Sequence, residues 1–138
     1  TPPGGGTTDY AIDMFHYAVQ NKPYTCFLNA TTTLPMMYME DALKATIGIM
    51  NAPKENISVR TSYNLSGVSF SPQELTECIL KFEPDFQVDY QADFRQQIAE
   101  SWPQSIDDNT AVKDWGWQPE YDLQRLTKVM LEGVKSLY

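Results

Sequence analysis

The sequence LPMMYMED, at residues 34–41, joins an apolar run to a pair of acidic residues. Residues 34–39 predict a strand, although Pro35 argues against a regular central strand because proline cannot donate a ladder hydrogen bond. The acidic pair opens a helix to about residue 50, and its many apolar side chains predict that this helix is largely buried. In an α/β sheet, a corner between strand and helix often faces a ligand crevice, so Tyr38 and Asp41 are candidate lining residues.

Periodic apolar residues, separated by Gly, Pro and Asn, predict the other elements on both sides of this corner. A helix capped by Thr7 or Thr8 comes first and ends at residues 21–23. The clearest signal is Ser-Pro-Gln-Glu at residues 71–74, a capping box that begins a helix to about residue 82. The remaining elements are strands at residues 24–28, 62–65 and 86–90, helices around 93–101 and before Gly116, and a final helix from about Asp122. This order predicts a mixed α/β fold.

The composition indicates a folded, acidic protein of about one domain. The chain has 138 residues, and 42% of them are hydrophobic, which is enough apolar material for a packed interior. Eighteen acidic and ten basic residues give a net charge of −8, which disfavours binding to nucleic acid or to an anionic membrane surface. No apolar stretch approaches the roughly 18 residues that a membrane span requires.

The start of the sequence and its cysteines bear on processing and compartment. Neither a signal segment nor an initiator Met opens the chain, and residues 1–6 resemble the middle of a loop, so we expect a fragment or a processed piece. Cys26 and Cys78 lie among apolar neighbours and predict buried free thiols. Free thiols favour a reducing intracellular compartment, either the cytoplasm or the mitochondrial matrix.

Metal and histidine chemistry find little support in the sequence. His16 is the single histidine, and it falls within the predicted first helix. The two cysteines lack a CxxC spacing. We therefore expect neither a metal site nor a nucleophilic triad that uses histidine.

The segment GGGTTD, at residues 4–9, is the most suggestive for ligand binding. Glycines let a ligand approach the backbone, and the helix that follows offers unpaired N–H groups at the positive end of its dipole. Together with the hydroxyls of Thr7 and Thr8, these groups suit a small carboxylate such as that of an amino acid. The alternative is an ordinary flexible entry loop. The segment is neither a P-loop nor a dinucleotide fingerprint, because no GK[ST] follows it and no strand precedes it within the chain.

A second cluster combines RQ at residues 95–96 with SWP at residues 101–103. An arginine pairs with carboxylates or phosphates, and a tryptophan beside a proline suits the wall of a pocket. Core packing is the alternative for Trp102. For the acidic pair at residues 107–108, helix capping explains the pattern better than a cation site.

Several segments, taken in order, carry a resemblance that none of them carries alone. They are PGGGTTDYA at residues 3–11, LPMMYMED at 34–41, FQV at 86–88, RQ at 95–96, SWP at 101–103 with the acidic pair at 107–108, and DWGW at 114–117. In this order the chain closely resembles the C-terminal half of the short-chain-type L-threonine 3-dehydrogenases. These belong to the extended short-chain dehydrogenase/reductase superfamily, which also contains the nucleotide-sugar epimerases. The resemblance implies the end of a Rossmann domain plus a small substrate-binding lobe, with residues 1–138 as the C-terminal substrate-binding portion.

The resemblance also implies an absent half. Members of this family carry an N-terminal Rossmann domain with a GxGxxG turn for NAD and a Tyr-x-x-x-Lys catalytic pair, and neither motif occurs in these 138 residues. The family oxidises the 3-hydroxyl of L-threonine, giving 2-amino-3-ketobutyrate, with the tyrosine as general base and NAD as hydride acceptor. It follows that this chain supplies no catalytic residue and is inactive alone, and that NAD is bound mainly by the other half. The parent enzyme is expected to be a homodimer formed through helices of that half.

The same resemblance suggests substrate-binding residues. Gly4, Thr7 and Asp9 are expected near the carboxylate and ammonium groups of L-threonine, in agreement with the interpretation of the glycine loop above. Trp102 is expected to close the pocket over the substrate methyl group. Arg95 corresponds to a position that serves the phosphates of nucleotide sugars in the epimerases, and since threonine has no phosphate, its role here stays open.

Two other hypotheses remain beside this one. The chain is alternatively part of another extended short-chain enzyme, such as a nucleotide-sugar epimerase, or a non-catalytic binding module. An upstream reading frame with GxGxxG and Tyr-x-x-x-Lys would support the enzyme hypotheses, and translation from near Thr1 would contradict them.

Overall fold

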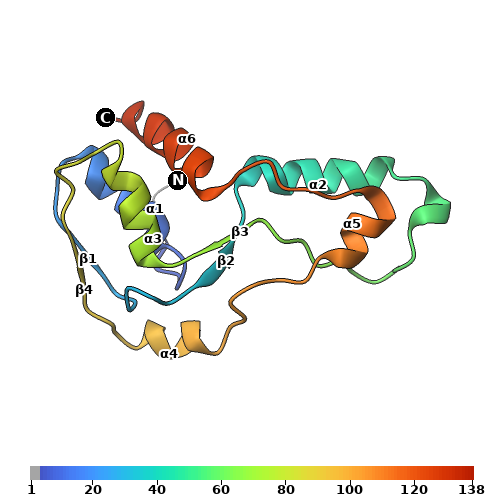
Figure 1. Ribbon diagram of the computed structural model, residues 1–138, viewed down its shortest axis with the longest axis horizontal. Coiled ribbons are helices and arrows are strands. Elements are labelled where there is room, and N and C mark those ends of the chain that lie inside the picture. The colour runs from blue at the N-terminus through green and yellow to red at the C-terminus, as the bar shows by residue number, and fades with distance from the viewer. Residues whose placement is uncertain (1–3) are drawn as a thin grey trace.

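The predicted order of helices and strands is present in the computed structural model, which describes residues 4–138 (Figure 1). Residues 1–3, part of the opening segment expected to be a loop, lie outside the described residues. In chain order the elements are α1 (Tyr10–Val19), β1 (Tyr24–Cys26), β2 (Leu34–Met36), α2 (Met39–Asn51), the short 3₁₀ helix η1 (Lys54–Asn56), β3 (Val68–Phe70), α3 (Pro72–Leu80), β4 (Val88–Tyr90), α4 (Arg95–Glu100), α5 (Asn109–Trp115) and α6 (Leu123–Lys135).

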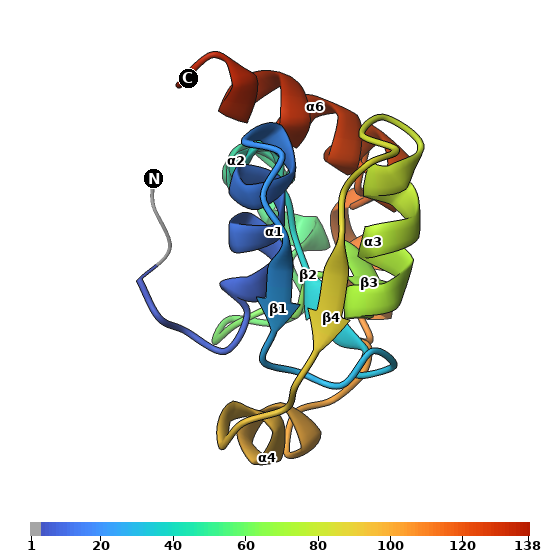
Figure 2. The same ribbon diagram turned by 90° about the vertical axis from the view of Figure 1, so that its left-hand side faces the viewer.

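The first sheet is a parallel pair of strands, β1 and β4, in which Tyr24 lies opposite Val88 and Cys26 opposite Tyr90. Helices α1, α3 and α6 pack against one another, and α1 also contacts β1. Figure 2 shows both strands running toward the end of the molecule where α1 begins and where α4 lies. The carboxyl ends of both strands and the start of α1 therefore share one end of the molecule.

The main core lies between this sheet and the three helices. Its large, fully buried side chains include Tyr10, Met14, Phe15, Leu28, Leu34 and Phe70. Because Leu34 and Phe70 face each other across β2 and β3, the second sheet, which is antiparallel, also packs onto the main core. Two of the predicted features, the buried thiols of Cys26 and Cys78, are confirmed, and both thiols are free.

A second region extends away from the main core and contains α2, η1 and α5 (Figure 1). Its own core, the second core, consists of Ala45, Ala111 and Trp117. Gly67, just before β3, lies at the junction of the two regions. A Cβ atom there would lie 2.5 Å from the carbonyl oxygen of Met36, so only glycine lets β3 approach β2 this closely.

Helix ends follow the predicted caps, with one exception. The side chain of Ser71 accepts a hydrogen bond from the backbone N–H of Glu74, and the side chain of Glu74 accepts one from the backbone N–H of Ser71. The predicted capping box is therefore confirmed. Asp122 caps α6, and Gly116 ends α5 with a left-handed φ of 72°. The expected cap by Thr7 or Thr8 is wrong, because these residues form a turn and Asp9 occupies the N-cap position of α1.

The strand predicted at residues 62–65 is wrong. This segment has no partner strand within residues 4–138, and the strand begins only at Val68, where pairing with β2 starts. Its apolar residues are used instead as packing surfaces. The Tyr63 ring meets Trp115 edge-on with ring centroids 4.6 Å apart, and Leu65 packs against the second core.

The expectation that the second helix, α2, is largely buried is also wrong. One side of it rests on the second core through Ala45, but the opposite side carries Met39, Leu43, Ile47 and Met50, which are 56–77% exposed. These four residues follow one another at spacings of four, four and three, so they share one face. We call them the exposed α2 face.

Candidate functional site

The carboxyl edge of the parallel pair is the place where a ligand is expected, because ligands of open α/β sheets bind outside the carboxyl ends of parallel strands. The pairing of β1 with β4 continues past the strands. The N–H of Gln91 donates to the carbonyl of Cys26 at 2.8 Å, and the N–H of Asp93 donates to the carbonyl of Phe27 at 3.1 Å. The two segments that leave the sheet are thus held side by side, and Phe27 and Asp93 lie at its edge.

Arg95 is fixed at this edge by an ion pair and an aromatic ring. Its Nε donates to both carboxylate oxygens of Asp93 at 3.1 Å, and its Nη2 donates to one of them at 2.6 Å. The guanidinium carbon lies 3.2 Å from the centroid of the Phe27 ring, a cation–π contact. We call this group of three residues the Arg95 clamp.

The ion pair changes the acidity of both partners. Hydrogen bonding to Arg95 holds the pKa of the Asp93 carboxyl below its ordinary value, and the same bond raises the pKa of Arg95. On α1, burial raises the pKa of Asp13, although a hydrogen bond from Tyr24 at 3.3 Å opposes this. Arg95 and Asp9 both act on Asp13 through their charges, so α1 and the Arg95 clamp contribute to one electrostatic environment.

The glycine loop, residues 4–9, cradles a carboxylate, but the carboxylate belongs to the loop itself. Oδ2 of Asp9 accepts hydrogen bonds from the N–H groups of Gly4 at 2.7 Å and Gly6 at 2.8 Å. Gly5 makes this possible with a φ of 91°, which side chains disfavour. Asp9 thus engages N–H groups of the loop's own glycines, not those of the first turn of α1 that were predicted to hold a ligand carboxylate, and Thr7 lies half-exposed within the loop.

Trp102 lies just beyond α4 and is 42% exposed. It lines a cavity of about 250 Å³ together with polar residues of the segment between β1 and β2 and of α4, among them Asn29, Thr32, Gln96 and Glu100. Gln96 accepts from the N–H of Asn29 at 2.9 Å and donates to Glu100 at 2.9 Å, which holds this wall in place. Within residues 4–138, no hydrogen bond or aromatic contact joins Trp102 to the glycine loop.

Of the two corner residues, Asp41 serves the fold, whereas Tyr38 packs on Tyr121 and also lines a cavity of about 310 Å³ beside α1 and α6. Asp41 is 1% exposed, and its carboxylate accepts the N–H groups of Glu120 at 2.9 Å and Tyr121 at 3.1 Å. The rings of Tyr38 and Tyr121 lie 4.4 Å apart, and Tyr121 donates to Glu40. Contrary to the prediction, Asp41 does not line a crevice, because it anchors the segment that leads into α6.

Capping explains the acidic pair at residues 107–108 in part. Asp107 accepts the N–H of Asn109, the first residue of α5, at 3.0 Å. Asp108 binds the N–H of Ser66 at 3.0 Å, which ties α5 to the segment before β3. Among the described residues, no group of three His, Cys, Asp or Glu side chains is placed to hold a metal ion, and His16 instead contacts the Tyr138 hydroxyl at 3.0 Å.

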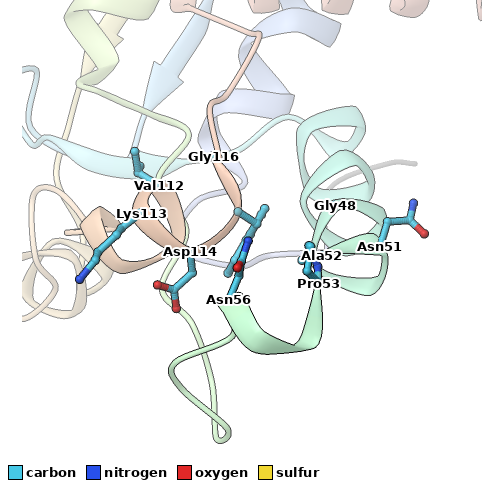
Figure 3. Close-up of a pocket in the computed structure, with 10 residues that line it drawn as sticks. Gly48, Asn51, Ala52, Pro53, Asn56, Val112, Lys113, Asp114 and Gly116 are labelled. Carbon is cyan, nitrogen blue, oxygen red and sulfur yellow. The ribbon is translucent and has the colours of Figure 1, made fainter.

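A larger cavity, of about 510 Å³, lies in the second region. Figure 3 shows its lining on the end of α2, on η1 and on α5. In Figure 1, α2 and α5 lie away from the parallel pair of β1 and β4. Asp114 lines it but is already held by the hydroxyls of Ser58 at 2.6 Å and Tyr63 at 2.5 Å. None of the residues that the sequence suggested for ligand binding lines this cavity.

Comparison with known proteins shows similarity along almost the whole chain. The mitochondrial L-threonine 3-dehydrogenase of Bos taurus is 52% identical over 130 residues, which are 94% of this chain and 35% of that protein. The structure of L-threonine dehydrogenase from Phytophthora infestans superposes with a TM-score of 0.95 at 52% identity, over 100% of this chain and 45% of that one. This chain matches the C-terminal part of the L-threonine 3-dehydrogenases.

Two further proteins with similar sequences or folds carry epimerase names. An uncharacterized epimerase/dehydratase of Staphylococcus epidermidis is 48% identical over 97% of this chain and 42% of its own length. A UDP-glucuronic acid 4-epimerase of Bacillus cereus, solved with UDP-glucuronic acid and NAD, superposes over 100% of this chain and 43% of its own with a TM-score of 0.77. Its identity is 18%, so it shares the fold alone. The fold is that of the C-terminal portion of the extended short-chain dehydrogenases, as the sequence predicted.

The chain spans between about a third and a half of the length of these relatives. No family model matches it. None of the helices in residues 4–138 is long and apolar enough to cross a membrane.

Sequence reasoning missed Phe27, Asp13 and Asp93. Asp93 had a signal, because an aspartate two residues before an arginine at a helix start is well placed both to cap the helix and to bind the arginine. Phe27 and Asp13 had none, since their nearness to Arg95 depends on the pairing of β1 with β4 and on the packing of α1 beside β1.

Proposed function

We propose that this chain is the substrate-binding part of an NAD-dependent L-threonine 3-dehydrogenase, which oxidises L-threonine to 2-amino-3-ketobutyrate. The observation that carries the proposal is the 52% identity to the bovine enzyme along 94% of the chain. The match to the Phytophthora infestans enzyme covers 100% of this chain and so includes the motifs PGGGTTDYA and LPMMYMED. The chain by itself is inactive under this proposal, because neither GxGxxG nor Tyr-x-x-x-Lys occurs in it.

The glycine loop binds the substrate through Asp9 and Thr7. Because Gly4 and Gly6 hold Oδ2 of Asp9, the loop presents a fixed carboxylate, which suits the ammonium group of an amino acid. Gly4, which was expected near the substrate, acts by positioning Asp9. The hydroxyl of Thr7 binds the substrate carboxylate, and Trp102 covers the methyl group.

The glycine loop of this chain does not fit the pyrophosphate of NAD. A dinucleotide pyrophosphate needs free N–H groups in a glycine-rich turn between a strand and a helix. In the glycine loop of this chain, the N–H groups of Gly4 and Gly6 are taken, and a carboxylate occupies the place where a phosphate would be held. We infer that NAD is bound by the N-terminal half of the parent enzyme.

That N-terminal half is also the proposed partner of the exposed α2 face. Four neighbouring apolar side chains, each more than half exposed, are uncommon on a surface that stays in water and usually mark a contact. The parent enzyme forms a homodimer through its N-terminal half. Its compartment is a reducing one, cytoplasm or mitochondrial matrix, in agreement with two free buried thiols and with the mitochondrial bovine relative.

The second candidate is a nucleotide-sugar epimerase or another extended short-chain enzyme. The 48% identity to the staphylococcal protein named as an epimerase/dehydratase favours it. Binding of a nucleotide sugar requires a cation free to meet its diphosphate, whereas Arg95 is paired with Asp93. A non-catalytic binding module is the remaining alternative.

A chimera tests the proposal. The chain replaces the matching C-terminal segment of the Phytophthora infestans enzyme. NADH formation is followed with L-threonine, and conversion of UDP-glucose to its epimer is followed separately, because an epimerase returns the hydride to the sugar and forms no net NADH. We expect oxidation that depends on threonine and no reaction with the nucleotide sugar. A chimera that binds NAD and keeps its helical circular dichroism, but does not oxidise threonine, would contradict the proposal. The 138-residue chain alone is the matched control and should form no NADH.

A further inference from the structure

Arg95 occupies a position where an anionic ligand would be met, yet the Nε–Nη2 edge of its guanidinium is in use. It lies at the carboxyl edge of a parallel strand pair, and a guanidinium presents N–H groups in a fork that matches a carboxylate or a phosphate. Here the Nε and Nη2 donors bind the carboxylate of Asp93. The ring of Phe27 covers one face of the guanidinium.

We propose that Asp93 is a specificity-determining residue, an internal anion that closes Arg95 to phosphate-bearing ligands. It acts through Arg95 and touches no substrate. Asp93 occupies the Nε–Nη2 edge of the guanidinium at short range, and a phosphate arriving at that edge would have to displace a carboxylate that the chain itself holds in place. Its meaning for the enzyme rests on the proposed function, since L-threonine carries no phosphate.

The surroundings of the Arg95 clamp support this closure. Asp13 adds negative charge near Arg95, which further disfavours a free anion. Asp93 is itself fixed, because its N–H donates to the Phe27 carbonyl at 3.1 Å and its Oδ1 accepts the backbone N–H of Arg95 at 2.8 Å. The carboxylate is thus part of the sheet edge, so it cannot swing away from Arg95 at little cost.

Asp93 binds both the backbone N–H and the guanidinium of Arg95, and one substitution can separate these two contacts. Asp93→Asn keeps an oxygen that accepts the backbone N–H of Arg95, so the start of α4 is preserved. It removes the negative charge and one of the two equivalent acceptors of the guanidinium. The variant therefore loosens the hold on Arg95 without removing the hydrogen bond to its backbone N–H.

The test is calorimetric titration of the 138-residue chain with inorganic pyrophosphate. We expect Asp93→Asn to bind pyrophosphate about tenfold or more tightly than the unchanged chain, as one charge-assisted contact regained implies. The double variant Asp93→Asn with Arg95→Gln should lose this gain, and Asp93→Glu should behave as the unchanged chain. Glu120→Gln is the matched control, because it frees Lys44 from an exposed ion pair and should leave binding unchanged.

Two results would overturn the inference. One is equal affinity of Asp93→Asn and the unchanged chain, with the same circular dichroism. The other is a gain that persists in the double variant. Thermal unfolding with and without pyrophosphate gives a second readout, in which only Asp93→Asn should be stabilised. Because neither measurement uses threonine or NAD, failure of the proposed function leaves this test intact.

Discussion

The main core and the second core bury their apolar side chains to very different degrees. In the main core, Phe15 is 1% exposed and Leu28 0%. Beside the second core, α2 leaves Leu43 56% and Ile47 58% exposed. The first region is closed by its own helices, whereas the second presents an apolar face that no residue of the described chain covers. This difference is why we assign the partner surface to α2 and the ligand edge to the main region.

Equivalent truncations in the two regions should differ most in stability. Leu28→Ala should lower the free energy of unfolding by about 2–5 kcal/mol, because it opens a cavity in a filled core. Leu43→Ala should change it by no more than about 0.5 kcal/mol, because its side chain is largely in water. Urea denaturation followed by circular dichroism measures both. Equal losses would show that α2 is covered in solution by something within the chain.

Charge on the exposed α2 face should abolish self-association. The isolated chain should bind a hydrophobic dye and sediment faster as its concentration rises, because four exposed apolar residues attract one another. Leu43→Glu with Ile47→Glu should remove both effects without unfolding the chain. Lys44→Glu, on the same helix beside that face, is the control and should leave dye binding in place. A compact monomer at high concentration without dye binding would refute the proposed partner surface.

The two regions should respond to pH in opposite directions. Hydrogen bonds from Ser58 and Tyr63 lower the pKa of Asp114, so its contribution to the second region is present above the ordinary carboxyl value of 3.8 and is lost as the pH falls below it. Burial raises the pKa of Cys26 to about 11, so the main core loses stability as the pH rises from the ordinary thiol value of 9.0 toward 11.

Two probes separate these pH effects. Fluorescence of Trp115 and Trp117 should report the acid change, which Asp114→Asn should remove. Thiol labelling of Cys26, in a Cys78→Ser background, should report the alkaline change. If both probes changed together at one pH, the two regions would be a single cooperative unit.

Local signals in the sequence predicted the helix ends, because caps and stops are set by a few neighbouring residues. The capping box at Ser71, the glycine stop at Gly116 and the cap at Asp122 each depend on a few adjacent residues, and all three are confirmed. The strand at residues 62–65 failed because a strand needs a partner, and pairing is set by residues far away. The burial of α2 failed for the same reason, since an apolar helix is buried only where another element covers it.

In the candidate site, too, the sequence identified single residues but not the contacts between them. The sequence singled out the glycine loop, Arg95 and Trp102, each from its own chemistry or from the family resemblance. It did not reveal that Asp9 fills the loop or that Phe27 lies under Arg95. Both contacts arise from backbone geometry, the left-handed φ of Gly5 in one case and the β1–β4 pairing in the other.

The most direct test of the central claim, that this chain binds L-threonine for its parent enzyme, is the kinetics of the chimera with Thr7→Ala or Trp102→Ala. Each change should lower kcat/KM for threonine about tenfold, mainly through KM. Thr7→Ala removes a hydrogen bond to a charged group, worth about 1.5–3 kcal/mol, and Trp102→Ala removes the apolar contact with the substrate methyl group. The KM for NAD should stay unchanged. Thr110→Ala, an exposed threonine of α5, is the control. Unaltered threonine kinetics in both variants would contradict the account.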